Sequence, residues 1–161
     1  MSNLVVDALI EIPTGSQNKY EFDKEAGVFR LDRVLYSPFH YPTEYGYIEN
    51  TLAEDGDPLD VLVLSTVPTF PGCVIETRVV GVLVMSDDKG QDEKLLGVPT
   101  KDPRFAQVQS LDDVAPHILK EIAHFFQVYK DLENKVTKIE GWKGVEDAKR
   151  ILDESYARYK K

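Results

Sequence analysis

The sequence predicts a mainly β (α+β) domain in which short strands form a small closed or nearly closed barrel and two C-terminal helices pack on its side. Short segments rich in Val, Ile, Leu and aromatic residues fill the first two-thirds of the chain. Turn residues separate these segments, and the apolar period becomes helical only in the last third. At 161 residues the chain fits one domain, so we expect a single domain over residues 1–161.

Six segments have the composition of strands, and residues that favour turns lie between them. The expected strands are residues 4–12, 19–22, 28–36, 59–64, 74–85 and 94–98. Turns are indicated at residues 13–15, 26–27, 55–58, 71–72 and 89–90, each of which contains Gly or Pro. No repeat or low-complexity tract interrupts this order.

Two helices are expected after residue 110, where apolar residues recur at helical spacing. The segment Ser110-Leu111-Asp112-Asp113 resembles a helix start. The first helix would align Ile118, Ile122, Phe125 and Tyr129, and a second helix after Gly144 would align Val145, Ala148, Leu152, Tyr156 and Tyr159.

The composition is that of an ordinary folded protein. Apolar residues make up 42% of the chain and charged residues 29%, enough for one core and a solvated surface. No apolar run approaches the roughly 18 residues of a membrane span, and we expect no secretory signal at the start of the chain. A single cysteine, Cys73, excludes an internal disulfide framework and is typical of a reducing compartment, so we expect a cytoplasmic location.

The chain is acidic, with a net charge of −9 from 28 Asp and Glu residues and 19 Lys and Arg residues. An acidic surface repels the phosphate backbone, so nucleic-acid binding through a basic face is not expected. Acidity by itself is ordinarily explained by solubility. The functional question is therefore whether the acidic residues gather in one place.

The densest acidic segment is Asp55-Gly56-Asp57-Pro58-Leu59-Asp60, which places three carboxylates where a turn enters a strand. Pro58 favours an extended residue before it, and Gly56 permits a tight turn. Two carboxylates about 4 Å apart repel by roughly 4 kcal/mol at an effective dielectric constant near 20, so converging carboxylates need a hard cation. An EF-hand is excluded, because its sixth and twelfth loop positions would hold Asp60 and Thr66. A solvated acidic loop remains the alternative for so short a motif.

A second acidic pair, Asp87 and Asp92, flanks residues 88–91, which have the composition of a hairpin loop. If this loop and the first acidic segment lie at the same barrel mouth, four or five carboxylates meet there. Oxygen-only ligands with open positions suit Mg²⁺, which keeps water ligands and commonly bridges to substrate phosphates. The two loops together therefore predict a magnesium site.

Several charged residues lie at unusual positions in the expected strands. Arg33 would interrupt an apolar row, where a charge is costly unless it is paired or lines a wet pocket. Lys19 with Glu21, and Asp92 with Lys94, would each place a cation beside an acid on one strand face. A single exposed ion pair of this kind contributes about 0–1 kcal/mol and is ordinary, so only the combination indicates a site.

The first acidic segment and many further motifs resemble the family I soluble inorganic pyrophosphatases, particularly the bacterial type. The resemblance runs from about Leu4 to beyond Trp142. It is carried by Asp55-Gly56-Asp57-Pro58-Leu59-Asp60-Val61, Ile10-Glu11-Ile12-Pro13, Lys19-Tyr20-Glu21, Asp32-Arg33, Tyr41-Pro42, Tyr45-Gly46-Tyr47, residues 87–94, His124-Phe125-Phe126, Tyr129-Lys130-Asp131-Leu132-Glu133 and Glu140-Gly141-Trp142. The resemblance implies a five-stranded OB-like closed barrel with two C-terminal flanking helices. It also implies magnesium-dependent hydrolysis of inorganic pyrophosphate to two orthophosphates by one pyrophosphatase domain, commonly within a homohexamer.

The resemblance further implies a role for each matched residue. Asp55, Asp60 and Asp92 would bind the first metal ion, and Asp60 would also reach the second. Asp87 and Asp92, with Glu11 and Glu21 partly through water, would serve the metal ions that arrive with substrate. Lys19, Arg33, Tyr129 and Lys130 would hold phosphate oxygens, while Lys94 and Tyr45 would line the substrate site. Asp57 would accept the proton of the attacking water, with Asp92 as the competing assignment.

The chemistry of these residue types agrees with such roles. Two metal ions that share a carboxylate can lower the pKa of one water and generate hydroxide at neutral pH, so no covalent intermediate is needed. Cationic side chains would neutralise the leaving phosphate, and bound metal reverses the sign of an acidic pocket. Two other functions stay open: a related metal hydrolase acting on nucleotides, and a non-catalytic OB-like binding module, against which the lack of a basic aromatic strand face argues.

Overall fold

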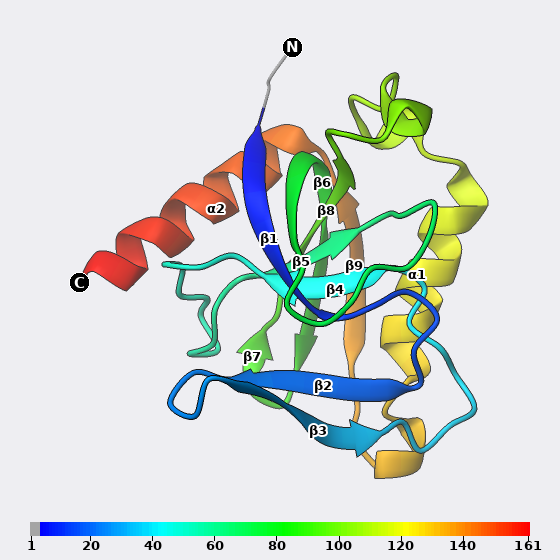
Figure 1. Cartoon of the computed structure of the whole chain (residues 1–161), viewed down its shortest axis with the longest axis vertical. Coiled ribbons are helices and arrows are strands. Elements are labelled where there is room, and N and C mark those ends of the chain that lie inside the picture. The colour runs from blue at the N-terminus through cyan, green and yellow to red at the C-terminus, as the bar shows by residue number, and fades with distance from the viewer. Residues whose placement is uncertain (1–3) are drawn as a thin grey trace.

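The computed structural model describes residues 4–161, so the expected absence of a secretory signal falls partly outside the described residues. The elements are β1 (Val5–Ile12), β2 (Asn18–Asp23), β3 (Val28–Val34), β4 (Glu44–Tyr47), β5 (Asp60–Val63), β6 (Val74–Asp87), β7 (Gly90–Gln91), β8 (Lys94–Pro99), α1 (Pro116–Val128), β9 (Lys138–Lys143) and α2 (Val145–Lys160) (Figure 1). Three short 3₁₀ helices, η1 (Pro103–Phe105), η2 (Leu111–Asp113) and η3 (Asp131–Glu133), lie in the connections.

Five strands form a closed ring of backbone hydrogen bonds. β1 pairs with β4 and β6, β4 pairs with β5, and β6 pairs with β8, all antiparallel, while β5 and β8 are parallel. β7 and β9 extend the sheet from β6, and β2 pairs with β3 in a separate two-stranded sheet. The ring order β1-β4-β5-β8-β6 confirms the predicted mainly β fold with two later helices.

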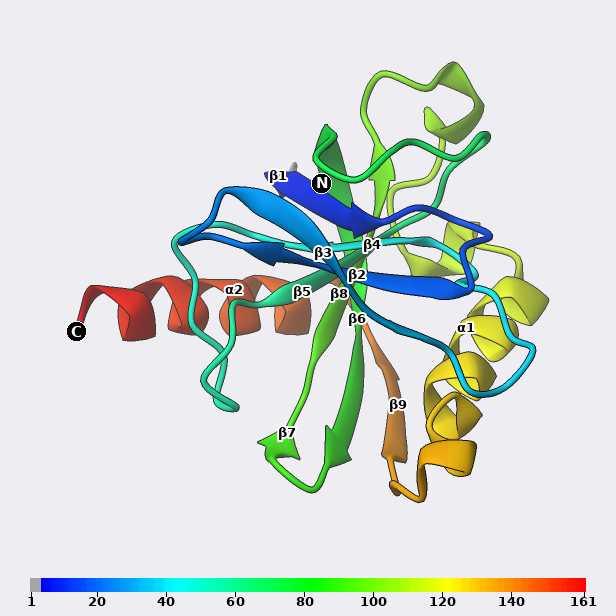
Figure 2. The same cartoon turned by 60° about the horizontal axis from the view of Figure 1, so that its bottom comes forward.

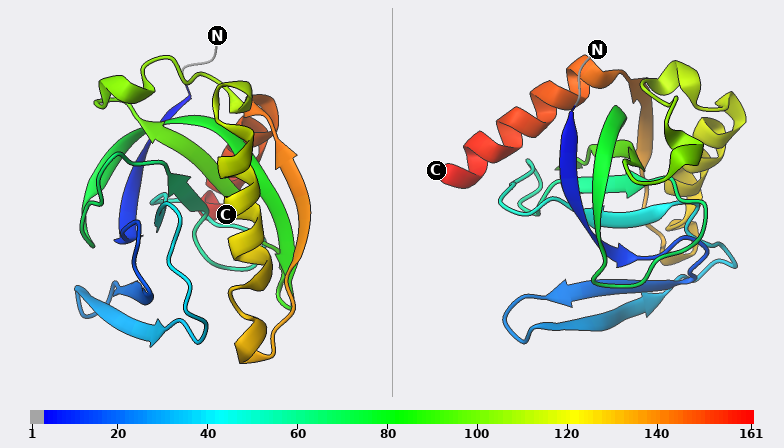
Figure 3. Two further views of the ribbon diagram at one scale, coloured as in Figure 1. Left: turned by 90° about the vertical axis from the view of Figure 1, so that its right-hand side faces the viewer. Right: turned by 45° about the horizontal axis from the view of Figure 1, so that its top comes forward.

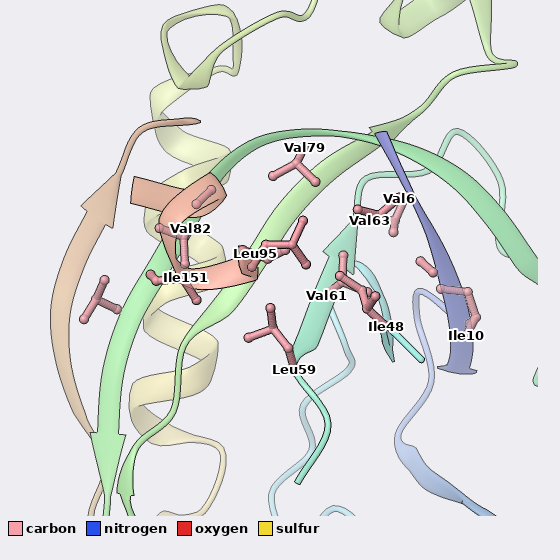
Figure 4. Packing of buried hydrophobic residues seen from close by; sticks show 14 residues of the cluster. Val6, Ile10, Ile48, Leu59, Val61, Val63, Val79, Val82, Leu95 and Ile151 are labelled. Carbon is pink, nitrogen blue, oxygen red and sulfur yellow. The ribbon is translucent and has the colours of Figure 1, made fainter. Parts of the chain in front are cut away.

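β6 connects the two hydrophobic clusters of the molecule. Apolar residues run along both of its faces, as expected for a strand that is covered on both sides. Val79 and Val82 belong to a cluster that β1, β5, β8 and α2 complete (Figure 4). Val80 and Leu83 belong to a second cluster that α1 completes. A register shift between Val79 and Gly81 bends the strand so that it can pair with β1, β8 and β9.

The two helices lie on different sides of the sheet (Figures 2 and 3). α1 packs beside β9, where the indole N–H of Trp142 donates to the Leu119 carbonyl at 3.1 Å. α2 buries Ala148 and Leu152, which the predicted apolar face includes, and also Ile151. None of the helices in the described part of the chain has the length and apolarity that a membrane crossing requires.

The start of the first helix differs from the prediction. Ser110 caps the 3₁₀ helix Leu111–Asp113, and α1 begins only at Pro116. Proline favours the first helical turn because its missing N–H would have no intrahelical partner there, so Pro116 marks the true start. Ile118 and Tyr159, which were expected to align with the other apolar residues of their helices, are exposed.

The β2–β3 hairpin lies apart from the ring (Figure 1). Among the strands of residues 4–161, β2 and β3 form backbone ladders only with each other. Phe22 and Phe29 pack together with ring centroids 4.8 Å apart. The hairpin brings the predicted phosphate-binding residues Lys19 and Arg33 beside the ring.

Candidate active site

One cavity of about 540 Å³ gathers the charged residues singled out by the sequence. Its lining includes every candidate site residue: Glu11, Lys19, Glu21, Arg33, Tyr45, Asp55, Asp57, Asp60, Asp87, Asp92, Lys94, Tyr129 and Lys130. These residues come from the ring, from the β2–β3 hairpin and from the segment after α1. The structure therefore brings together residues up to 119 positions apart, from Glu11 to Lys130.

A second cavity, of about 480 Å³, lies between β1, the segment after β4 and α2. The charged part of its lining is acidic, with Asp7, Glu49 and Glu76. No lysine or arginine of the described residues lines it. An anionic substrate would find no cationic partner there, so the first cavity is the candidate active site.

Two loops deliver the aspartates to the active-site cavity. Asp55 and Asp57 lie in the turn before β5, and Asp60 is the first residue of that strand. Asp87 ends β6, and Asp92 lies between β7 and β8. All five line the cavity, so both acidic loops contribute to one site.

Lys94 lies at the centre of these carboxylates, because the parallel pairing of β5 and β8 sets it beside Asp60. Its side chain is 1% exposed. The ammonium donates to Asp60 Oδ2 at 2.8 Å, to the Tyr45 hydroxyl at 3.0 Å and to Asp92 Oδ1 at 3.3 Å. Burial alone would lower the pKa of Lys94, but the charges of Asp60 and Asp92 raise it well above its ordinary value. All three N–H groups are engaged, so in this arrangement Lys94 holds carboxylates and has no free donor.

The carboxylates around the cavity are partly desolvated. Burial raises the pKa of Glu11 to about 7, with the charge of Asp60 adding to the effect and the Phe22 N–H opposing it. Burial likewise raises the pKa of Asp55 and of Asp92. A cation that binds among crowded carboxylates relieves their mutual repulsion and favours their ionised form.

The donor set fits a hard divalent cation, because carboxylate oxygens dominate it. Within residues 4–161, no three His, Cys, Asp or Glu side chains lie closely enough together to hold an ion. The Lys94 ammonium bridges Asp60 and Asp92 instead. A bound cation would therefore compete with Lys94 for these two carboxylates and draw the others inward.

The cationic residues of the hairpin are held by acidic partners. Lys19 Nζ lies 3.3 Å from Asp32, and Arg33 bonds to both Asp32 and Glu133. Asp32 and Glu133 were not among the predicted site residues. The position of Arg33 in an apolar row could have indicated them, because a charged side chain in such a row needs a partner of opposite charge. The row itself is not core, because Leu31 is 55% exposed.

Tyr129 and Lys130 follow the end of α1 and form another part of the cavity wall. Burial raises the pKa of Tyr129 to about 12, so its hydroxyl stays protonated at neutral pH and can donate a hydrogen bond. Burial lowers the pKa of Lys130.

The chain matches one protein family along nearly its whole length. The family described as inorganic pyrophosphatase aligns with residues 8–160. The chain belongs to the inorganic pyrophosphatase family. Membership confirms the resemblance to family I pyrophosphatases of bacterial type that the motifs indicated.

Relatives of the inorganic pyrophosphatase family are similar to this chain over almost all of their length. The inorganic pyrophosphatase of Geobacillus stearothermophilus is 64% identical over 157 residues, which cover 98% of this chain and 95% of the relative. That of Nostoc sp. is 59% identical over 156 residues, covering 97% and 92%. The structure from Thermus thermophilus has a TM-score of 0.94 at 49% identity, covering 98% and 92%, and that from Helicobacter pylori has 0.95 at 44%, covering 99% and 96%.

Membership of the inorganic pyrophosphatase family implies a divalent metal cofactor. The carboxylates of the cavity suit such a cofactor by their oxygen ligands and by their crowding. The cationic residues on the neighbouring walls suit an anionic substrate. The cavity therefore combines carboxylates that suit a divalent cation with cationic side chains that suit an anion.

Proposed function

We propose that the chain hydrolyses inorganic pyrophosphate to two orthophosphates in a magnesium-dependent reaction, by attack of a metal-activated water and without a covalent intermediate. The observation that carries this proposal is a single cavity in which carboxylates and cations face each other, in a member of the inorganic pyrophosphatase family. Carboxylates recruit the metal ions, and the cations together with those ions compensate the charge of the diphosphate.

In this proposal the acidic residues hold several Mg²⁺ ions. Asp55, Asp60 and Asp92 bind the first ion, Asp60 also reaches the second, and Asp87, Asp92, Glu11 and Glu21 serve the ions that arrive with substrate. Bound Mg²⁺ supplies one chemical effect, the lowering of the pKa of a coordinated water. Lys94 and Tyr45 line this part of the substrate site and hold Asp60 and Asp92 in place.

The cationic wall binds the substrate. Lys19, Arg33 and Lys130 hold phosphate oxygens by charge, and the protonated Tyr129 hydroxyl donates a hydrogen bond. These groups also compensate the charge that builds up on the leaving phosphate. Their fixed positions place the phosphorus atom for attack, which lowers the entropic part of the barrier.

The proton of the attacking water goes to a carboxylate. Asp57 is exposed at the edge of the cavity and carries no ion pair among residues 4–161, so it is free to accept a proton from water. Asp92 is the competing acceptor, but it already accepts a hydrogen bond from Lys94. We therefore assign Asp57 as the general base.

The test is phosphate release from three substrates. Purified protein is given pyrophosphate, ATP or a phosphate monoester with Mg²⁺, and the pyrophosphate reaction is repeated with excess chelator. We expect fast release from pyrophosphate alone and its loss on chelation. A strong preference for ATP would instead identify a nucleotide hydrolase, and tight oligonucleotide binding without turnover would identify a binding module.

The remaining parts of the proposal concern the whole protein. We propose one pyrophosphatase domain over residues 1–161, a homohexameric assembly and a cytoplasmic location, with no nucleic-acid or membrane partner. The acidic net charge of −9 supports the exclusion of nucleic acid. Analytical ultracentrifugation measures the assembly directly, and a mass other than six chains would overturn the hexamer.

A further inference from the structure

Arg33 lies on a hairpin that the ring does not hold through strand pairing. β2 and β3 form their own two-stranded sheet, which lies to one side of the ring (Figures 1 and 3). One side-chain link to β1 is the Glu11 carboxylate, which accepts the Phe22 N–H at 2.9 Å. A contact of the Arg33 side chain with another part of the molecule therefore helps to set its position relative to the rest of the cavity.

Glu133, in the 3₁₀ helix that follows α1, provides such a contact. Its Oε2 accepts a hydrogen bond from Arg33 Nε at 3.0 Å, across 100 positions of sequence. The Glu133 side chain is 7% exposed and that of Arg33 is 22% exposed. A carboxylate so well buried is costly without a partner, so this ion pair differs from the exposed pairs of the helices.

The contact fixes the orientation of the guanidinium. An arginine has five N–H donors in a rigid fork. Nε donates to Glu133 and Nη1 donates to Asp32, while Nη2 has no protein acceptor among residues 4–161. Arg33 lines the cavity and Glu133 does not. Glu133 and Asp32 thus accept hydrogen bonds from Nε and Nη1 of the guanidinium, and Nη2 can still donate to an anion.

We propose that Glu133 is a positioning residue for Arg33. Through this ion pair it ties the β2–β3 hairpin to the segment that carries Tyr129 and Lys130, and so sets the spacing between the two cationic walls of the cavity. The inference rests on the proposed function only in taking the anion to be a phosphate group of the substrate. It gives Glu133, which does not line the cavity, a role in substrate affinity.

The test is a double-mutant cycle with Arg33→Ala and Glu133→Ala. We expect Glu133→Ala to lower kcat/KM for pyrophosphate by about 10- to 100-fold, mainly through KM, because it releases a charge-assisted hydrogen bond that orients a binding group. In the Arg33→Ala background, Glu133→Ala should lower it by less than about threefold further. Glu133→Gln, which keeps an acceptor for Nε, should recover much of the loss.

Asp131→Ala is the matched control, because Asp131 lies in the same 3₁₀ helix, is exposed and forms no ion pair among the described residues. It should leave kcat/KM unchanged. A Glu133→Ala variant with normal KM, or losses that simply add in the cycle, would overturn the inference. Should Glu133→Ala fail to fold, Glu133→Gln and inorganic phosphate titrations of each variant decide the same question.

The outcome is separable from the proposed function. If the unmodified protein does not release phosphate from pyrophosphate, the proposed function fails while the phosphate titrations still test the role of Glu133. If the unmodified protein is active and Glu133→Ala binds phosphate as tightly as it does, only the positioning role fails.

Discussion

Asp57 is accessible to water and forms no ion pair among residues 4–161, as a side chain that accepts a proton from water requires. Its side chain is exposed, and its backbone N–H donates to Asp55 Oδ1 at 3.0 Å, which fixes the turn that presents it. We predict that Asp57→Asn lowers kcat by roughly 10²- to 10⁴-fold, the usual contribution of a positioned acid–base group. Phosphate release measures this effect. Glu54→Gln, an exposed neighbour outside the cavity, is the control, and normal turnover of Asp57→Asn would move the role to Asp92.

Lys94 differs from the exposed Asp57, because its side chain is buried and its ammonium donates three hydrogen bonds. Lys94→Met keeps a long unbranched side chain but leaves Asp60 and Asp92 without their counter-cation. We predict a loss of about 3–5 kcal/mol in the free energy of unfolding in chelator, the usual result of breaking a buried ion pair from one side. Denaturant titration measures the loss. Mg²⁺ should restore part of it, because the ion replaces the missing positive charge.

The matched control for Lys94→Met is Lys101→Met, which removes an exposed lysine. It should change the free energy of unfolding by less than about 0.5 kcal/mol. A Lys94→Met protein as stable in chelator as the unmodified one would show that the two carboxylates are not held by this ammonium.

The sequence predicted which residues line the site, but it did not predict the contacts that they make with each other. Motif matches indicated every candidate that lines the cavity, including residues as far apart as Glu11 and Lys130. They did not indicate that Lys94 would be buried with all its donors engaged, because burial depends on the pairing of β5 with β8. Glu133 was missed as a functional residue for the same reason, since its contact with Arg33 exists only in three dimensions.

At the scale of elements, β4 can approach β1 closely because residue 46 is a glycine. A Cβ at this position would lie 1.9 Å from the Leu9 carbonyl oxygen, a backbone atom that no side-chain movement can clear. We predict that Gly46→Ala destabilises the fold by about 3 kcal/mol or more. Thermal and denaturant unfolding measure the loss, and Tyr45 on the same strand should lose its hydrogen bond to Asp60, with a fall in activity.

Gly144→Ala is the control for this substitution, because a Cβ there meets nothing within 4 Å. Gly144 is the N-cap of α2, where alanine is a weaker cap, so a loss below about 1 kcal/mol is expected. Equal losses for the two variants would mean that β1 and β4 do not approach as closely as the structure shows.

The sequence predicted those strands that contain a long run of apolar residues. The strands at residues 4–12 and 74–85 correspond to β1 and β6, whose apolar runs are unambiguous. β4 and β9 were not predicted. β4 has only four residues, and β9 carries three lysine or glutamate residues that face solvent, so neither has a strong alternation of its own. Both strands are formed because a neighbour in the sheet supplies their hydrogen bonds.

At the scale of the whole molecule, exchanging the metal ion tests whether the combined geometry of the cavity residues matters for turnover. Ca²⁺ takes longer bonds and more ligands than Mg²⁺. We predict that replacing Mg²⁺ by Ca²⁺ lowers turnover by about 10²-fold, the usual effect of misplacing an attacking group by 1 Å. Phosphate release gives the rate, and thermal unfolding with each ion shows that Ca²⁺ is bound. Full activity in Ca²⁺ would contradict a reaction that depends on tight octahedral geometry.

The order of strands in the ring has a consequence for biosynthesis. β8 lies between β5 and β6, yet it leaves the ribosome after both of them. Until residue 99 has emerged, β5 and β6 each present an unpaired edge, and the nascent chain can form only an open sheet. Tyr129 and Lys130 emerge later still, so a ribosome-bound fragment holds the hairpin and the acidic loops before it holds these two residues. Translation thus adds Tyr129 and Lys130 to the cavity wall after all the other candidate site residues.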